Sequence, residues 1–215
     1  MSAARKLVIV GGAFVIAVIL LLIYVFVWLA YNPATIKVGS ATATSTNLEL
    51  ATTGTIDYGT HPDWVSYLTR QNGKWVHTTV WQVPAHSTIH VTLFEYDTQT
   101  GLRNPFISQV RGTIGNVAVE NGKTVRYLNP NLPAHSFSIP ELGVNVPLAG
   151  ISQSTYPGDL TNPHNTHVTI HFSFKVGGPE TVHWQCFVPC AAGYLFGWGG
   201  PMQTIGYMDG YIKIV

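Results

Sequence analysis

THVTIHFSFKV, residues 166–176, is the stretch that most clearly indicates a fold class. Its residues alternate between apolar and polar, so the two sets fall on opposite faces of an extended chain. The apolar face carries Val168, Ile170, Phe172, Phe174 and Val176, and the polar face carries His167, Thr169, His171, Ser173 and Lys175. This period of two is typical of a half-buried β-strand. We therefore expect His167 and His171 to be solvated or hydrogen-bonded and not to be metal ligands.

The chain around this strand, from about residue 64 onward, has the same character. Short runs of Val, Ile, Thr and aromatic residues are broken by Gly, Pro and Asn, which is typical of an all-β sandwich or barrel. Asn121-Gly122 predicts one β-hairpin, and Asp209-Gly210 predicts a second. We expect residues 64–215 to form one all-β domain. The preceding segment, 32–63, is rich in Thr, Ser and Ala without clear periodicity, and is expected to be a linker wrapped over the domain.

The N-terminus carries a long apolar run, LVIVGGAFVIAVILLLIYVFVWLAY, at residues 7–31. At about 1.5 Å per residue, a helix of this length crosses a hydrocarbon core of about 30 Å. A cleavable signal peptide has a shorter apolar region and ends at small residues. We therefore expect residues 1–31 to be a short cytoplasmic stub and one retained transmembrane helix. Arg5 and Lys6 precede the run, which places the N-terminus in the cytoplasm and the domain outside the cell membrane.

The composition of the exported part restricts its partners and its medium. Excluding Arg5 and Lys6 leaves 9 Lys and Arg residues against 10 Asp and Glu, so no basic surface is available for nucleic acid. Charged residues make up only 10% of the chain, where about 25% is usual. Few carboxylates means few groups whose protonation unfolds the domain, which suits an acidic medium and an acidophilic source.

Both cysteines lie in QCFVPCAAGYLFGWGGPM, residues 185–202. Two cysteines at this spacing either share a metal ion or bond to each other. A copper site of the electron-transfer kind also requires imidazole. All nine histidines precede Cys186, and they are at positions 61, 77, 86, 90, 135, 164, 167, 171 and 183. The sequence after Cys190 therefore offers no imidazole ligand.

One histidine, His135, lies in LPAHSFSIPELGVNVPL, residues 132–148. Its His-Ser-Phe, Ile-Pro and Leu-Gly-Val elements resemble subunit II of the heme-copper terminal oxidases, in which this histidine binds the two-copper CuA centre. The pair Cys186 and Cys190 resembles the copper loop of that family, whose pattern continues as three residues, a histidine, two residues and a methionine. The resemblance covers roughly residues 80–215. It implies a cupredoxin-like Greek-key β-barrel or sandwich behind one N-terminal transmembrane helix.

The match to the CuA pattern is incomplete. His135, Cys186 and Cys190 stand at ligand positions, but the second histidine is replaced by Tyr194 and the methionine by Gly197. A phenol with a pKa near 10 is a poor substitute for imidazole on copper. The resemblance thus implies a variant without a complete CuA site and without a metal in this chain. Two thiols outside the cell at this spacing then predict a Cys186–Cys190 disulfide.

A member of the family that lacks CuA resembles subunit II of a quinol oxidase. The resemblance implies a non-catalytic subunit with a structural or assembly role on the outer face of an oxygen-reducing, proton-pumping respiratory complex. Its partners would be subunit I, which holds the hemes and CuB, other membrane subunits, and membrane quinol. Phe196, Trp198 and Met202 either pack on the end of the barrel or dock on a partner, and we expect docking for this loop.

Other functions remain open from the sequence. The chain could be a membrane-anchored copper electron-transfer protein, or a CuA-type cytochrome c oxidase subunit II with a non-standard ligand set. It could also be a binding or assembly module unrelated to respiration. Bound copper would favour the first two of these functions.

Overall fold

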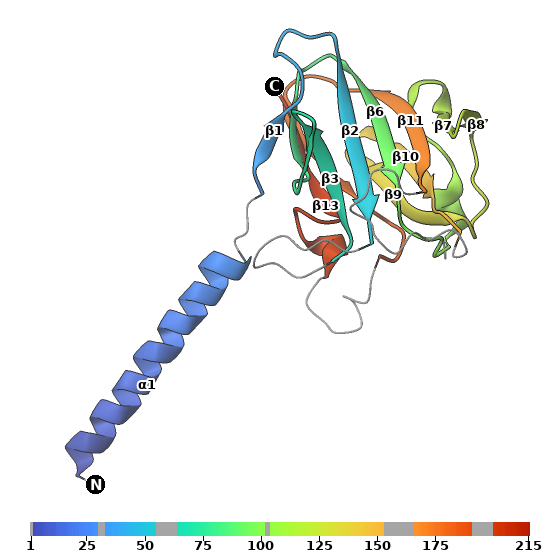
Figure 1. The fold of residues 1–215 in the computed structure, drawn as a ribbon. Coiled ribbons are helices and arrows are strands. Elements are labelled where there is room, and N and C mark those ends of the chain that lie inside the picture. The colour runs from blue at the N-terminus through green and yellow to red at the C-terminus, as the bar shows by residue number, and fades with distance from the viewer. Residues whose placement is uncertain (1, 30–32, 55–63, 102–103, 153–165, 191–199) are drawn as a thin grey trace. The chain divides into compact units, whose positions relative to one another are not determined.

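The computed structural model describes residues 2–29, 33–54, 64–101, 104–152, 166–190 and 200–215. The chain divides into two compact units, Met1–Asn32 and Pro33–Val215. Figure 1 shows the elements of both units.

The first unit is a single helical segment. Helix α1 (Ala3–Ile23) begins after Ser2, whose hydroxyl accepts a hydrogen bond from the Arg5 amide, and it continues as a π-helical stretch, η1 (Tyr24–Leu29). The part from Ala4 to Phe26 is long and apolar enough to cross a membrane. A helix of this kind near an N-terminus serves either as a membrane anchor or as a signal sequence.

The second unit consists of two mixed β-sheets, which confirms the predicted all-β class. The six-stranded sheet contains, in spatial order, β1 (Thr35–Lys37), β5 (Val80–Val83), β13 (Asp209–Ile214), β12 (Glu180–Gln185), β9 (Pro133–Ile139) and β10 (Val144–Ala149). The seven-stranded sheet contains β4 (Lys74–Val76), β3 (Ser66–Gln71), β2 (Ser45–Thr53), β6 (Thr88–Glu95), β11 (Val168–Lys175), β7 (Ala118–Glu120) and β8 (Lys123–Val125). Short 3₁₀ helices connect some strands: η2 (Pro105–Ser108), η3 (Ile114–Asn116), η4 (Pro140–Leu142) and η7 (Pro201–Gln203).

The core lies between the two sheets and is rich in aromatic rings. Phe137 on β9 stacks on Trp184 of β12 at 5.5 Å and contacts Phe172 of β11, on the opposite sheet, at 5.3 Å between ring centroids. Trp81 of β5 stacks on Trp184 at 5.1 Å. Such ring pairs add about 0.5–1.5 kcal/mol each beyond the apolar area that they bury. The cluster fixes β9 and β12, the two strands that lead to the cysteines and to His135.

The alternation predicted for residues 166–176 is present in β11. Ile170, Phe172 and Phe174 are buried, while His171 and Lys175 are exposed. The strand pairs antiparallel with β6 over its whole length. The predicted half-buried strand is therefore confirmed.

The segment 32–63, expected to be an irregular linker, contains two strands. β1 pairs with β5, and β2 runs parallel to the central strand β6 from Ser45 to Thr52. The side chains of Leu48 and Leu50 are fully buried in the core. Thr and Ser occupy most other positions of β2, and β-branched Thr fits a pleated strand even where the sequence looks too polar for one.

One predicted hairpin is present and the other is absent. Asn121 and Gly122, with φ of 46° and 80°, form the turn between β7 and β8. Asp209 and Gly210 are instead the first two residues of β13, so the hairpin predicted there was wrong. A Cβ atom on Gly210 would collide with the carbonyl of Thr79 and come within 2.6 Å of Trp184 Nε1. The glycine therefore permits close packing of β13 against β12 and against Thr79, the residue before β5, and it does not form a turn.

Candidate metal centre

Strand β9 and the segment after β12 together position a histidine and two cysteines. His135 lies on β9 opposite Leu148 of β10, and all seven residues of β9 are buried. Cys186 follows the last residue of β12, and its amide donates to the carbonyl of Met208 at 3.0 Å. Cys190 lies four residues further on. The side chains of all three residues are buried.

The donor atoms of these residues converge. His135 Nδ1 lies 3.0 Å from Cys190 Sγ and 4.0 Å from Cys186 Sγ, and the two sulfur atoms are 3.0 Å apart. All three atoms fall within 4.8 Å of one another. One imidazole nitrogen and two sulfurs form the donor set that soft and borderline metals such as copper and zinc prefer. The residues present therefore fit a soft metal ion, and the metal-free chain that the sequence predicted is not confirmed.

Both cysteines are free thiols in this structure, which differs from the predicted Cys186–Cys190 disulfide. Each sulfur has other partners that direct it into the cluster. The Ser136 amide donates to Cys186 Sγ at 3.3 Å, and the Val188 carbonyl accepts from Cys190 Sγ at 2.9 Å. Together with His135 Nδ1, these contacts place both sulfurs in one buried cluster, where they lie 3.0 Å apart without a bond between them.

A residue that the sequence analysis missed completes the surroundings of His135. Asp97 Oδ2 lies 3.1 Å from His135 Nε2, on the side of the ring opposite the sulfurs. A carboxylate on the second nitrogen of a metal-binding histidine is a common feature of metal sites, since it fixes the ring's tautomer and orientation. Asp97 is 38 residues away from His135 in the sequence, and no motif or spacing marked it as a partner.

The charges of the cluster are strongly coupled. Burial alone raises the pKa of Cys186, but hydrogen bonds from Cys190 and His135 outweigh it and hold the pKa well below its usual range. Burial and the neighbouring Cys186 raise the pKa of Cys190 well above its usual range. Burial lowers the pKa of His135, but Glu95 and Asp97 more than compensate and hold it above the ordinary value. Cys186 is therefore the more acidic of the two thiols.

The predicted docking loop is described only at its end. Met202 in η7 is partly buried against the core, and its sulfur accepts a hydrogen bond from the Cys190 amide at 3.3 Å. The Gln185 side chain donates to the Met202 carbonyl. Tyr194, Phe196 and Trp198 lie outside the described residues, so docking of this loop stays a prediction.

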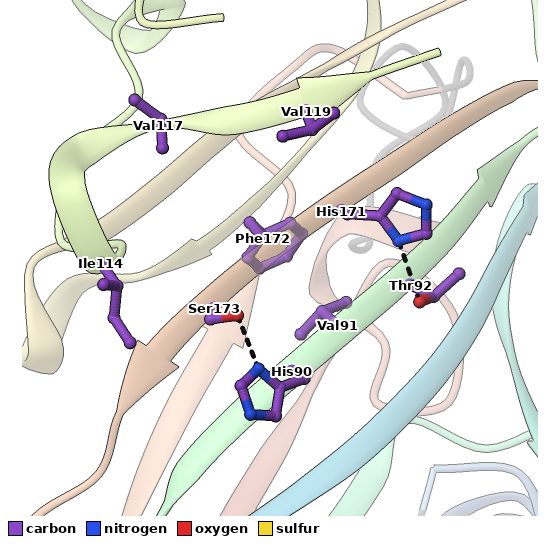
Figure 2. Close-up of a pocket in the computed structure, with 9 residues that line it drawn as sticks. All are labelled: His90, Val91, Thr92, Ile114, Val117, Val119, His171, Phe172 and Ser173. Atoms are coloured by element: carbon purple, nitrogen blue, oxygen red, sulfur yellow. Dashed lines mark hydrogen bonds between the residues drawn. The ribbon is translucent and has the colours of Figure 1, made fainter. Parts of the chain in front are cut away.

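Two histidines with no part in the cluster line a pocket of about 460 Å³ on the outer face of β6 and β11 (Figure 2). His171 Nδ1 is 3.1 Å from Thr92 Oγ1, and His90 Nδ1 is 2.8 Å from Ser173 Oγ. His171 is therefore hydrogen-bonded and exposed, as expected. His183, three residues before Cys186, bonds through Nε2 to Asp209 Oδ1 and does not join the sulfurs.

Comparisons with known proteins complete the description. No protein-family model matches the chain, and no curated protein matches it. The solved structures that match include a methionine-to-leucine variant of rusticyanin, at 12% identity and a TM-score of 0.35, covering 86% of this chain and 84% of that one. Rusticyanin from Thiobacillus ferrooxidans also matches at 12% identity, with a TM-score of 0.31 and the same coverage. A further match, another structure of the copper protein rusticyanin, has 12% identity and a TM-score of 0.33, and it covers 84% of this chain and 82% of that one.

Proposed function

We propose that the chain is a membrane-anchored extracytoplasmic domain that binds copper through His135, Cys186 and Cys190 and carries electrons. The observation that supports this most directly is the convergence of His135 Nδ1 with both cysteine sulfurs in a buried site. Bound copper would supply a one-electron redox couple. The residues of the chain supply soft thiolate donors, an imidazole donor and a scaffold that excludes water from them.

The surroundings of the cluster suit such a role. Cys186 is fully buried and Cys190 is 3% exposed, so the donors are shielded from solvent and from external thiols. Ser136 and Val188 hold the sulfurs through backbone groups, and the stacked rings of Phe137 and Trp184 hold the strands on which the donors depend. A rigid donor set requires little rearrangement when the charge at the site changes.

The first unit supports the proposed location. Helix α1 is apolar over a membrane-spanning length, and Arg5 and Lys6 lie at its N-terminal end. A retained single-pass helix with this charge bias leaves the N-terminus in the cytoplasm and the β-domain outside. The anchor would keep the copper domain beside membrane-bound electron donors and acceptors.

A second candidate function is subunit II of a heme-copper quinol oxidase, with a structural role on the outer face. The observation that favours it is the sequence after Cys190, where Tyr194 and Gly197 replace the histidine and methionine of the CuA pattern. In that case the hemes and CuB would lie in subunit I, quinol would deliver electrons to that subunit, and this chain would need no metal. A cytochrome c oxidase subunit II with a non-standard ligand set would instead retain copper at the three donors.

Copper binding by the full-length chain in detergent separates these functions. The chain is purified without oxidants, loaded with Cu(I), freed of excess metal, oxidised, and analysed for copper content and visible absorption. We expect one copper per chain and a thiolate-to-copper charge-transfer band. His135→Gln and Cys186→Ser should lose both signals, whereas the matched control His171→Gln should keep them. A wild-type chain without bound copper that purifies with a heme-containing subunit would overturn the proposal in favour of the quinol oxidase.

A further inference from the structure

We infer that Asp97 is a positioning residue of this metal centre, which holds the His135 ring so that Nδ1 faces the two sulfurs. The inference rests on the proposed copper site. The contact that carries it joins Asp97 Oδ2 to His135 Nε2 at 3.1 Å, where the His135 side chain is 2% exposed and that of Asp97 19%. Because Nε2–H donates to Asp97, the Nδ1 lone pair is the one available to a metal ion.

Asp97 is itself fixed by its neighbours. Its second oxygen, Oδ1, accepts the Thr98 amide at 2.7 Å, so both carboxylate oxygens have donors. Its own amide donates to Glu95 Oε1 at 2.9 Å, and its carbonyl accepts from the Ile151 amide at 3.0 Å. Hydrogen bonds on both the backbone and the side chain leave the carboxylate little freedom to turn away from His135.

The loop that follows Asp97 is bonded directly to the strand that carries His135. The amides of Thr100 and Gly101 both donate to the Pro133 carbonyl at 3.0 Å, at the start of β9. The Thr100 hydroxyl lies 3.2 Å from the carbonyl of Ala134, the residue before His135. The Asp97 carboxylate and the His135 imidazole therefore belong to two segments that are bonded to each other only one to four residues away from these side chains.

A glycine makes this close approach possible. A Cβ atom on Gly150, the residue after β10, would lie 2.7 Å from the Gln99 amide nitrogen, 2.8 Å from Ala134 Cβ and 2.9 Å from the Thr98 carbonyl carbon. Real Cβ atoms do not approach other heavy atoms so closely, because such distances lie inside van der Waals contact. Any larger residue at position 150 would push the Asp97 loop away from β9.

The charge of Asp97 has a separate effect from its position. A carboxylate makes a stronger hydrogen bond to an imidazole N–H than a neutral acceptor does. It also increases the basicity of the ligating nitrogen and adds negative charge near the metal. Removing the charge should therefore weaken copper binding and favour the reduced metal, and removing the whole side chain should weaken binding further.

The test uses three variants of the full-length chain in detergent. Asp97→Asn keeps an oxygen acceptor but loses the charge, Asp97→Ala loses both, and Glu49→Gln removes an exposed carboxylate on β2 as a matched control. Copper affinity is measured by competition with a chelator, the reduction potential by redox titration, and folding by circular dichroism. We expect affinity to fall about 10-fold in Asp97→Asn and up to about 100-fold in Asp97→Ala. The reduction potential of the copper should rise in both Asp97 variants, whereas Glu49→Gln should match the wild type in affinity and potential.

The outcomes separate the two proposals. A wild-type chain that binds copper, together with a folded Asp97→Ala variant of unchanged affinity and potential, would overturn the role of Asp97 and leave the copper site standing. A wild-type chain that binds no copper would overturn both. If Asp97→Ala does not fold, Asp97→Asn alone decides, because the asparagine keeps one side-chain oxygen that can accept the hydrogen bond from His135 Nε2.

Discussion

His135 Nδ1 and Cys190 Sγ lie 3.0 Å apart although 55 residues separate them in the chain. The histidine comes from the interior of β9 and the cysteine from the segment after β12, so only the folded sandwich brings them together. An unfolded chain cannot present the same donor set. Binding of a metal ion at this pair would therefore be linked to folding.

Copper should stabilise the domain against unfolding. At a free Cu(I) concentration about 100-fold above Kd, the free energy of unfolding should rise by about 2.7 kcal/mol, because the ion binds the folded chain and not the unfolded one. Urea denaturation under anaerobic reducing conditions, with and without copper, measures the change. Cys190→Ser serves as the control and should show little gain. If the chain binds one copper ion but the urea concentration at the midpoint of unfolding does not change, the unfolded chain binds copper as well as the folded chain does.

Gly150→Ala should damage the metal centre from a distance. The added methyl group would meet the loop of residues 98–99 and Ala134, and overpacking of this kind usually destabilises by about 1–3 kcal/mol. Displacement of the loop should also separate Asp97 from His135 and weaken copper binding in the direction expected for Asp97→Ala. Gly177→Ala is the matched control, since a Cβ there meets nothing within 4 Å. Equal stability and copper affinity in the two variants would show that the Asp97 loop can move without consequence.

The sequence was most informative where a periodic pattern coincides with burial. β11 was predictable because its apolar and polar residues alternate strictly, and the β7–β8 turn was predictable because Asn121-Gly122 suits positive φ at both positions. Asn72-Gly73 forms the same kind of turn between β3 and β4, with positive φ at both positions. β2 could not be found by periodicity, because buried threonines such as Thr52 occupy positions where a core strand usually has apolar residues.

The metal centre was predictable only in part. His135, Cys186 and Cys190 were found as a set through their resemblance to a known copper pattern, and the structure brings all three together. Asp97 had no such signal, because its pairing with His135 depends on loop contacts to Pro133 and Ile151 that leave no mark in local sequence. Residues that orient a ligand from another part of the chain become visible only when the fold is known.

Glu120 should make the domain more stable in acid than at neutral pH. Burial raises the pKa of this carboxyl to about 7, partly offset by a hydrogen bond from the Ala149 backbone. The folded chain therefore holds the proton more tightly than the unfolded chain, for which the pKa is 4.5. The stabilising contribution is fully present below pH 4.5 and is lost as the pH rises through about 7. The free energy of unfolding falls by an amount on the order of 3 kcal/mol over this range, because each pKa unit between the folded and unfolded chain corresponds to about 1.4 kcal/mol.

Glu120→Gln tests this directly, since the amide stays neutral at every pH. Urea denaturation between pH 4 and 8 should show a flatter pH dependence in the variant, which should match the wild type at pH 4 and exceed its stability at pH 8. A remaining slope of the same sign is expected from Glu95, whose pKa burial also raises to about 7. If the stability of the variant and of the wild type changes with pH to the same extent, Glu120 is not a source of the pH dependence. Greater stability in acid would agree with the acidic medium suggested by the low content of charged residues.

The two cysteines should be recovered as free thiols and not as a disulfide. Their sulfurs are shared among His135 Nδ1, the Ser136 amide and the Val188 carbonyl, and oxidation would withdraw both from these partners. Full-length chain isolated anaerobically, then unfolded and alkylated without a reductant, should gain two labels by intact mass. A chain that gains no label and whose mass is lower by two hydrogen atoms would instead support the Cys186–Cys190 disulfide.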